Sequence, residues 1–111
     1  MAISRLERLK MYLAEDPTDA FTQFAIAQEY LKMGHIHTAK EVFEALVATH
    51  PAYIGTYYHL GKLYEKMGDP KKAEETYKMG TQVADSQSAM HERAELQSAL
   101  ISLQLNLDDD D

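Results

Sequence analysis

The chain contains an internal repeat of 34 residues, which restricts it to folds built by stacking copies of one small unit. Residues 20–53 align with residues 54–87 without a gap. Seven positions are identical in the two copies: Thr22 and Thr56, Tyr30 and Tyr64, Lys32 and Lys66, Met33 and Met67, Gly34 and Gly68, Ala39 and Ala73, and Glu41 and Glu75. The identities gather at small, aromatic and glycine residues, so the repeat reflects shared structure.

Each copy has the residue spacing of two helices. Apolar and aromatic residues recur every three or four positions in the first half of each copy and again in the second half. Gly34 and Gly68 separate the halves, and glycine readily adopts the left-handed conformation that ends many helices. Asp69-Pro70 then supplies an N-cap oxygen and a proline at the first helical position. We therefore expect an all-α protein.

The two copies resemble the tetratricopeptide repeat, in which an aromatic residue, a Leu-Gly pair and a Tyr are followed by Ala, an aromatic residue and Pro. The second copy carries Tyr57, Leu60, Gly61, Tyr64, Ala73 and Tyr77, with Asp85 in place of the Pro. The first copy carries Ile26, Ala27, Tyr30, Ala39, Phe43 and Pro51, with Gln23 in place of the first aromatic residue, a role that Phe24 could fill. The resemblance implies an α-α superhelix, a solenoid of about six antiparallel helices.

The same register organises the flanking segments. Residues 3–14 place four leucine or isoleucine residues on one helical face, in the slot of the second helix of a truncated repeat. The apolar segment after Asp85 falls in the slot of a first helix and should cap the solenoid. We expect a single domain over residues 1–107, comprising a half-repeat helix (1–19), two repeats (20–53 and 54–87) and a capping helix (88–107), followed by an acidic tail (108–111).

Length and composition exclude several classes of protein. A chain of 111 residues allows one domain and hardly two. The absence of cysteine excludes structural disulfides, thiolate metal sites and a cysteine nucleophile. The formal charge of −7 argues against nonspecific nucleic-acid binding. Because no apolar run is long enough for a signal sequence or a membrane span, we expect a cytoplasmic protein that does not bind membranes.

No group of residues predicts catalysis, a cofactor or a metal site. His35 and His37 lie in the turn between two paired helices, where a solvent-exposed turn accounts for them better than a metal site does. The sequence contains no nucleophile elbow, phosphate-binding loop or HExxH motif. The four terminal aspartates lack the alternating spacing of a calcium-binding loop. We therefore expect a protein that is not an enzyme.

The resemblance implies protein binding, because the first helices of successive repeats line a concave groove that accepts a segment of a partner. Helical phase places eight residues on the groove side: Phe21, Phe24, Gln28, Tyr58, His59, Lys62, Arg93 and Leu96. We therefore predict a monomeric adaptor or scaffold with an aromatic and basic peptide-binding groove. As alternatives, Phe24 could be buried against the N-terminal helix, and Lys62 and Arg93 could pair with Glu65 and Glu92.

Two further expectations concern the partner. Tetratricopeptide proteins that bind chaperone tails hold a C-terminal carboxylate with two lysines, two asparagines and an arginine. This sequence has Phe24, Gln28, His59, Ala89 and Arg93 at those positions, and because only Arg93 agrees, we expect no such clamp. The alternative function is a structural module that forms a homodimer through the capping helix, whose apolar residues extend beyond one stripe: Leu100, Ile101, Leu103, Leu105 and Leu107.

Overall fold

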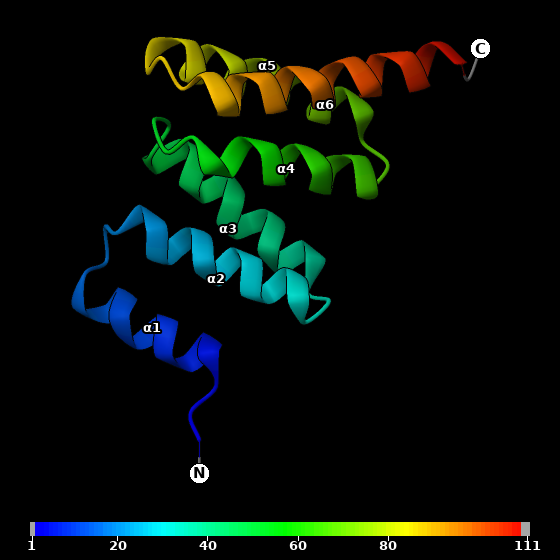
Figure 1. The fold of residues 1–111 in the computed structure, drawn as a ribbon. Coiled ribbons are helices and arrows are strands. Elements are labelled where there is room, and N and C mark those ends of the chain that lie inside the picture. Colours follow the sequence, from blue (N-terminus) through cyan, green and yellow to red (C-terminus); the bar gives the residue numbers. More distant parts are fainter. Residues whose placement is uncertain (1, 110–111) are drawn as a thin grey trace. The chain divides into compact units, whose positions relative to one another are not determined.

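The computed structural model describes residues 2–109, and these form six helices joined by short turns (Figure 1). The helices are α1 (Arg5–Glu15), α2 (Ala20–Lys32), α3 (Ile36–Thr49), α4 (Gly55–Lys66), α5 (Pro70–Ser86) and α6 (Met90–Asp109). There is no strand within residues 2–109. The prediction of an all-α protein built from helical pairs is therefore confirmed.

The chain divides into two compact units, and the division falls between the two copies of the repeat. The first unit extends from Met1 to Tyr53 and contains α1, α2 and α3. The second unit extends from Ile54 to Asp111 and contains α4, α5 and α6. Each unit thus consists of one complete helical pair and one flanking helix.

The core of the first unit is formed where α2 packs against α1 on one side and α3 on the other. Leu9 of α1 is buried against Ala25 and Ile26 of α2. Ala27 of α2 and Phe43 of α3 are fully buried. Small residues on α2 therefore let both neighbouring helices approach closely, since ridges of side chains on one helix fit into the grooves of the next.

The core of the second unit combines large rings with glycines. Tyr57 of α4 and Tyr77 of α5 are almost completely buried. A Cβ added to Gly80 of α5 would lie 2.5 Å from Cβ of Tyr57, so the backbone of α5 packs directly against the Tyr57 side chain of α4. α6 packs against α5 and, more lightly, against α4. The buried side of α6 contributes Leu96 to this core.

The predicted helix ends are confirmed in detail. Gly34 and Gly68 have φ angles of 81° and 78°, the left-handed conformation that glycine adopts without steric cost. The amide of the next residue then bonds back over the helix end, from His35 to Tyr30 O and from Asp69 to Tyr64 O, each at 2.9 Å. The Asp69 carboxylate accepts from the amide of Lys72 at 3.2 Å and caps α5.

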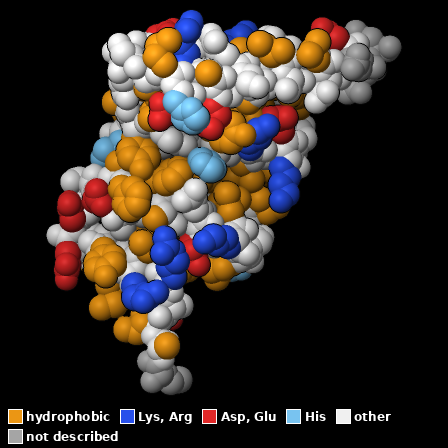
Figure 2. Space-filling model, viewed as in Figure 1, with side chains coloured by type: hydrophobic (Ala, Val, Ile, Leu, Met, Phe, Trp, Pro, Cys, Tyr) orange, Lys and Arg blue, Asp and Glu red, His pale blue; other side chains and the backbone are white. Residues whose placement is uncertain are grey.

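The C-terminal helix is longer than predicted. α6 begins at Met90 and continues to Asp109, so Asp108 and Asp109 are helical although an acidic tail was expected to begin at residue 108. The remaining two residues of the predicted tail, 110–111, lie outside the described part of the chain. The helix passes the expected boundary because its leucines maintain helical spacing up to the aspartates. Hydrophobic side chains are also exposed along α6 (Figure 2).

Candidate functional site

Two adjacent tyrosines of α4 lie on different faces of the helix, one buried and one turned outward. Tyr57 is 1% exposed and packs beside Gly80, whereas Tyr58, the next residue, is only half-buried. Residues three and four positions apart share a helix face, so Tyr58 is joined on the outer face by residues of the same phase. We call this group the Tyr58 surface: Tyr58, His59, Lys62 and Glu65.

The side chains of the Tyr58 surface contact one another. The rings of Tyr58 and His59 meet nearly perpendicularly, at 85°, with their centroids 5.7 Å apart. Nζ of Lys62 lies 5.6 Å from the centroid of the Tyr58 ring, within the range of a cation–π interaction. The same ammonium group lies 3.8 Å from Oε2 of Glu65. The surface therefore combines an aromatic ring, a cation and an anion within about two turns of helix.

Glu65 connects this surface to the core of the second unit. Its carboxylate accepts a hydrogen bond from the hydroxyl of Tyr77 in α5. Burial of the ring, together with this bond to a carboxylate, raises the pKa of Tyr77 above its usual value. The hydroxyl consequently remains protonated and keeps donating, which holds the Glu65 side chain in place.

His59 lies where α4 approaches α6. Burial lowers the pKa of His59, and the charge of Glu95 in α6 opposes this shift. Because burial is the larger effect, the neutral imidazole is favoured. His59 is thus a half-buried polar group that can exchange hydrogen bonds without carrying a charge at neutral pH.

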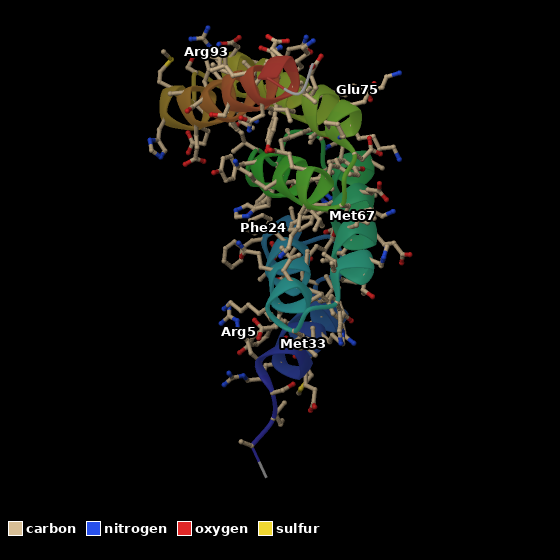
Figure 3. All side chains as sticks on the ribbon, turned by 90° about the vertical axis from the view of Figure 1, so that its right-hand side faces the viewer. Arg5, Phe24, Met33, Met67, Glu75 and Arg93 are labelled. Atoms are coloured by element: carbon tan, nitrogen blue, oxygen red, sulfur yellow. The ribbon has the colours of Figure 1, made fainter. Side chains whose placement is uncertain are left out.

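Arg93 forms an ion pair that the sequence analysis did not consider. Nε of Arg93 lies 2.5 Å from Oδ1 of Asp85, near the C-terminus of α5, whereas the alternative offered from the sequence was Glu92. The pair joins α6 to α5 across the turn that precedes α6. Arg93 lies on a different side of the unit from Glu75 of α5 (Figure 3). The expected pairing of Lys62 with Glu65 is present. The two predicted groove cations of the second unit, Lys62 and Arg93, therefore each have a carboxylate beside them.

Leu96 was predicted to line the groove, and this prediction is wrong. The side chain is 1% exposed, and its Cδ1 would lie 3.1 Å from a Cβ added to Gly80. The prediction transferred the helical phase of α4 to α6 through the 34-residue register. Lys62 and Leu96 share that register, yet Lys62 is exposed and Leu96 is buried, because α6 turns a different face towards its neighbours.

The first unit contains the other three predicted groove residues. Phe21 is exposed, whereas Phe24 and Gln28 are half-buried. The ring of Phe24 lies 5.9 Å from that of Phe43 and 5.6 Å from that of Tyr53. The orientation of Phe24, which the sequence left open, is therefore towards the rings of Phe43 and Tyr53.

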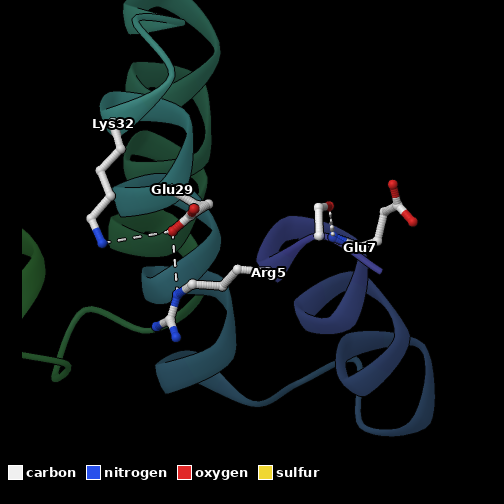
Figure 4. Close-up of polar contacts among 5 residues, drawn as sticks. Arg5, Glu7, Glu29 and Lys32 are labelled. Atoms are coloured by element: carbon white, nitrogen blue, oxygen red, sulfur yellow. Dashed lines mark hydrogen bonds and ion pairs between the residues drawn. The ribbon is translucent and has the colours of Figure 1, made fainter. Parts of the chain in front are cut away.

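Two polar contacts of the first unit were missed by sequence reasoning. Nε2 of Gln23 donates to the carbonyl of Pro17 at 3.0 Å, which explains a glutamine where the repeat pattern has an aromatic residue. Nε of Arg5 lies 3.2 Å from Oε2 of Glu29 and so links α1 to α2 (Figure 4). Gln23 replaces the aromatic residue of the repeat pattern, and Arg5 stands where the 34-residue register has Ala39 and Ala73. Only these two departures signalled the contacts.

The described residues hold neither a cluster of potential metal ligands nor a membrane-spanning helix. Among the described residues, no three histidine, aspartate or glutamate side chains gather closely enough to hold a metal ion. None of the helices in the described part is both long and apolar enough to cross a membrane.

The comparison with known families identifies the architecture. The sequence model of the tetratricopeptide repeat matches residues 30–100. The chain belongs to the tetratricopeptide repeat family. A tetratricopeptide repeat domain protein from Salinibacter ruber, solved by NMR, is 45% identical, with a TM-score of 0.76 over 79% of this chain and 89% of that chain. Tetratricopeptide repeats stack into extended surfaces suited to binding other proteins.

Two more distant similarities show less about this chain. The crystal structure of PcrH in complex with the chaperone binding region of PopD has a TM-score of 0.81 and covers 91% of this chain and 77% of that chain. At 15% identity, it shares the fold alone. The mouse N-alpha-acetyltransferase 16, NatA auxiliary subunit, is 37% identical over 60 residues, which are 53% of this chain and 7% of that protein. The tetratricopeptide chain thus matches only a small part of that subunit.

Proposed function

We propose that this tetratricopeptide repeat chain is a protein-interaction module that binds a peptide segment of a partner at the Tyr58 surface. The observation that carries the proposal is the difference between two adjacent tyrosines. Tyr57 already fills the space between α4 and α5, so packing does not require Tyr58. A partly exposed tyrosine supplies contact area and a hydroxyl at small entropic cost, and tyrosine is common among residues that dominate binding energy.

The ion pairs indicate the chemistry of the segment. Lys62 and Glu65 are 3.8 Å apart, too far for a hydrogen bond, and the Lys62 side chain is 47% exposed. Such a pair contributes little to stability, so Lys62 can turn to a carboxylate of the partner at small cost. Arg93, at 2.5 Å from Asp85, is held much more closely. We therefore expect a segment that places an apolar or aromatic residue on Tyr58 and an acidic residue near Lys62.

Other considerations support a protein partner. PcrH, which has the same fold, was solved with a segment of another protein, although the low identity transfers neither its partner nor its contacts. Phe21, Phe24 and Gln28 are proposed as contacts of the first unit, where Phe21 is exposed and the other two are half-buried. The proposed role is that of an adaptor or scaffold rather than an enzyme.

The test begins by selecting peptides from a random display library against the wild-type chain and measuring their dissociation constants by calorimetry. Tyr58→Ala should raise the dissociation constant of a selected peptide at least about tenfold, which corresponds to a loss of roughly 1.4 kcal/mol of binding energy. Tyr12→Ala is the matched control, because Tyr12 is an exposed tyrosine on α1. Equal binding of the selected peptides to wild type and Tyr58→Ala would contradict the proposal.

A further inference from the structure

Helix α6 carries an exposed stripe opposite its buried side. Leu96, Ala99 and Leu103 are buried and pack towards the rest of the second unit. On the other side, five exposed residues follow one another at intervals of four, four, three and four positions, the spacing that keeps residues on one helical face. We call them the outer stripe: Met90, Ala94, Ser98, Ile101 and Leu105.

The outer stripe is more apolar than a helix face in contact with water requires. Met90, Ile101 and Leu105 are 66%, 56% and 59% exposed. Aligned exposed apolar side chains on one helix face mark an interaction surface. The sizes of the side chains along the stripe indicate what covers it. Ala94 and Ser98 are small, whereas Ile101 and Leu105, which follow them, are large.

We propose that α6 pairs antiparallel with α6 of a second copy of this chain, about a two-fold axis between Ser98 and Ile101. In this register Ser98 lies opposite Ile101 of the second copy, and Ala94 lies opposite Leu105. Ala94 and Ser98 then each face a large apolar residue, so the seam is filled evenly between Ala94 and Leu105. A parallel pairing would oppose Ile101 to Ile101 and Ser98 to Ser98, which crowds one layer and leaves the next empty.

The charges favour the same arrangement. Asp108 is exposed near the C-terminus of α6, where the helix dipole disfavours a carboxylate. The antiparallel register places Asp108 beside the N-terminal end of the second helix and opposite its His91. Glu95, which is also exposed, faces the neutral Gln104. The seam therefore contains no opposed like charges, whereas a parallel pairing would oppose Asp108 to Asp108.

The length of the helix limits the strength of the dimer. α6 has 20 residues. Such a helix is about 30 Å long, and one pair of helices of this length buries less than the roughly 1,600 Å² of a standard protein interface. We therefore expect a reversible dimer that dissociates on dilution. The interface leaves the Tyr58 surface on α4 unused, so the two proposals can fail separately.

Analytical ultracentrifugation of the full chain across a series from micromolar to millimolar concentration tests the association. Wild type should pass from monomer to dimer, and Ile101→Glu with Leu105→Glu should remain monomeric throughout. Ala94→Glu is a second variant with the same expectation, because its carboxylate would face Leu105. Met79→Glu is the matched control, since Met79 is 45% exposed on α5 and outside the stripe, and it should dimerise like wild type.

Circular dichroism checks that each variant retains its helices. A wild-type chain that remains monomeric at the highest concentration overturns the proposal. A dimer that survives the stripe variants, or one that Met79→Glu abolishes equally, also overturns it.

The register has its own test, because the chain has no cysteine and single cysteines can be introduced cleanly. In the antiparallel pair, the two copies of position 98 are offset along the helix by about 5 Å, and the two copies of position 90 by about 28 Å. A short bismaleimide should therefore join Ser98→Cys chains and leave Met90→Cys chains unlinked. Linkage of both variants, or of Met90→Cys alone, overturns the antiparallel register.

Discussion

Gly61 lies so close to Tyr77 that a Cβ added to it would be 2.2 Å from Cε1 of the tyrosine ring. The ring is fully buried, and its hydroxyl is bonded to Glu65. In the first copy of the repeat, the same two positions hold Ala27 and Phe43, both fully buried. The copies thus contain two alternative pairs, one with a glycine and an anchored tyrosine, the other with an alanine and a phenylalanine.

This relationship predicts a coupled pair of substitutions. Gly61→Ala should lower the free energy of unfolding by about 1–3 kcal/mol, because the new methyl group displaces a ring held at both ends. Tyr77→Phe should cost about 1–2 kcal/mol through the lost hydrogen bond to Glu65. The double variant should cost less than the sum, because an unanchored phenylalanine can move away from the methyl group, as in the Ala27–Phe43 pair. Urea denaturation measures all three values.

Gly68→Ala is the control for this experiment. Gly68 has a φ of 78° with no atom within 4 Å of an added Cβ, so its substitution strains the backbone without touching Tyr77. Its cost should be the same with and without Tyr77→Phe. Strict additivity of Gly61→Ala and Tyr77→Phe would show that the hydroxyl does not hold the ring in place.

The N-terminus of α3 can be improved by copying the second repeat. His35 is the N-cap of α3 and makes no side-chain capping bond, whereas Asp69 occupies the same repeat position and caps α5. His35→Asp should raise the free energy of unfolding by about 0.5–1 kcal/mol by satisfying a free helix amide. Thermal denaturation measures the gain. His35→Ala removes the ring that stacks on Tyr30 without adding a cap, so a gain in that variant as well would refute the capping explanation.

Stability should decrease in acid because of His59. Its pKa in the folded chain lies below 6.5, so the unfolded chain binds more protons as the pH falls through that value. The free energy of unfolding should therefore be larger above pH 6.5 and decline below it until the folded pKa is passed. His59→Gln should flatten this part of the curve and leave the region above about pH 7.5 parallel to wild type. Denaturation at a series of pH values checks the slope, and identical slopes would contradict the assignment.

The attachment of α1 should depend on Leu9 and hardly on Arg5. Leu9→Ala should cost about 2–4 kcal/mol, because Leu9 fills the contact with Ala25 and Ile26. Arg5→Ala should cost less than about 0.5 kcal/mol, since the ion pair with Glu29 is more than half exposed on the arginine side. Hydrogen exchange should show loss of protection in α1 for Leu9→Ala while α5 keeps its protection. A larger effect from Arg5→Ala would reverse this ranking.

The helical architecture could be predicted from the sequence because its signals are local. The glycines that end α2 and α4, and the Asp69-Pro70 start of α5, act within a single turn of chain. The apolar spacing likewise indicates which face of each paired helix is buried, and Phe43 and Tyr77 confirm it. The pairing of Lys62 with Glu65 was also accessible, because both residues lie on one helix three positions apart.

The candidate site was predicted less well because it depends on how helices turn towards one another. Leu96 was assigned to a groove by the phase of α4, but its burial depends on the rotation of α6 against Gly80. Arg93 has Asp85 as its partner rather than Glu92, since the turn between α5 and α6 brings those two side chains together. Neither contact follows from spacing along a single helix.

The sequence by itself determined the repeat, its helices and the family, because these depend on short-range periodicity and on residues that end or begin helices. Only the tertiary structure decided the orientation of Phe24, whose ring lies against the rings of Phe43 and Tyr53. It also decided that the C-terminal helix buries Leu96 and exposes Ile101 and Leu105. The physical reason is that residue spacing sets the direction in which a side chain points from the axis of its own helix. Whether that side chain is buried depends on whether a neighbouring helix lies in that direction.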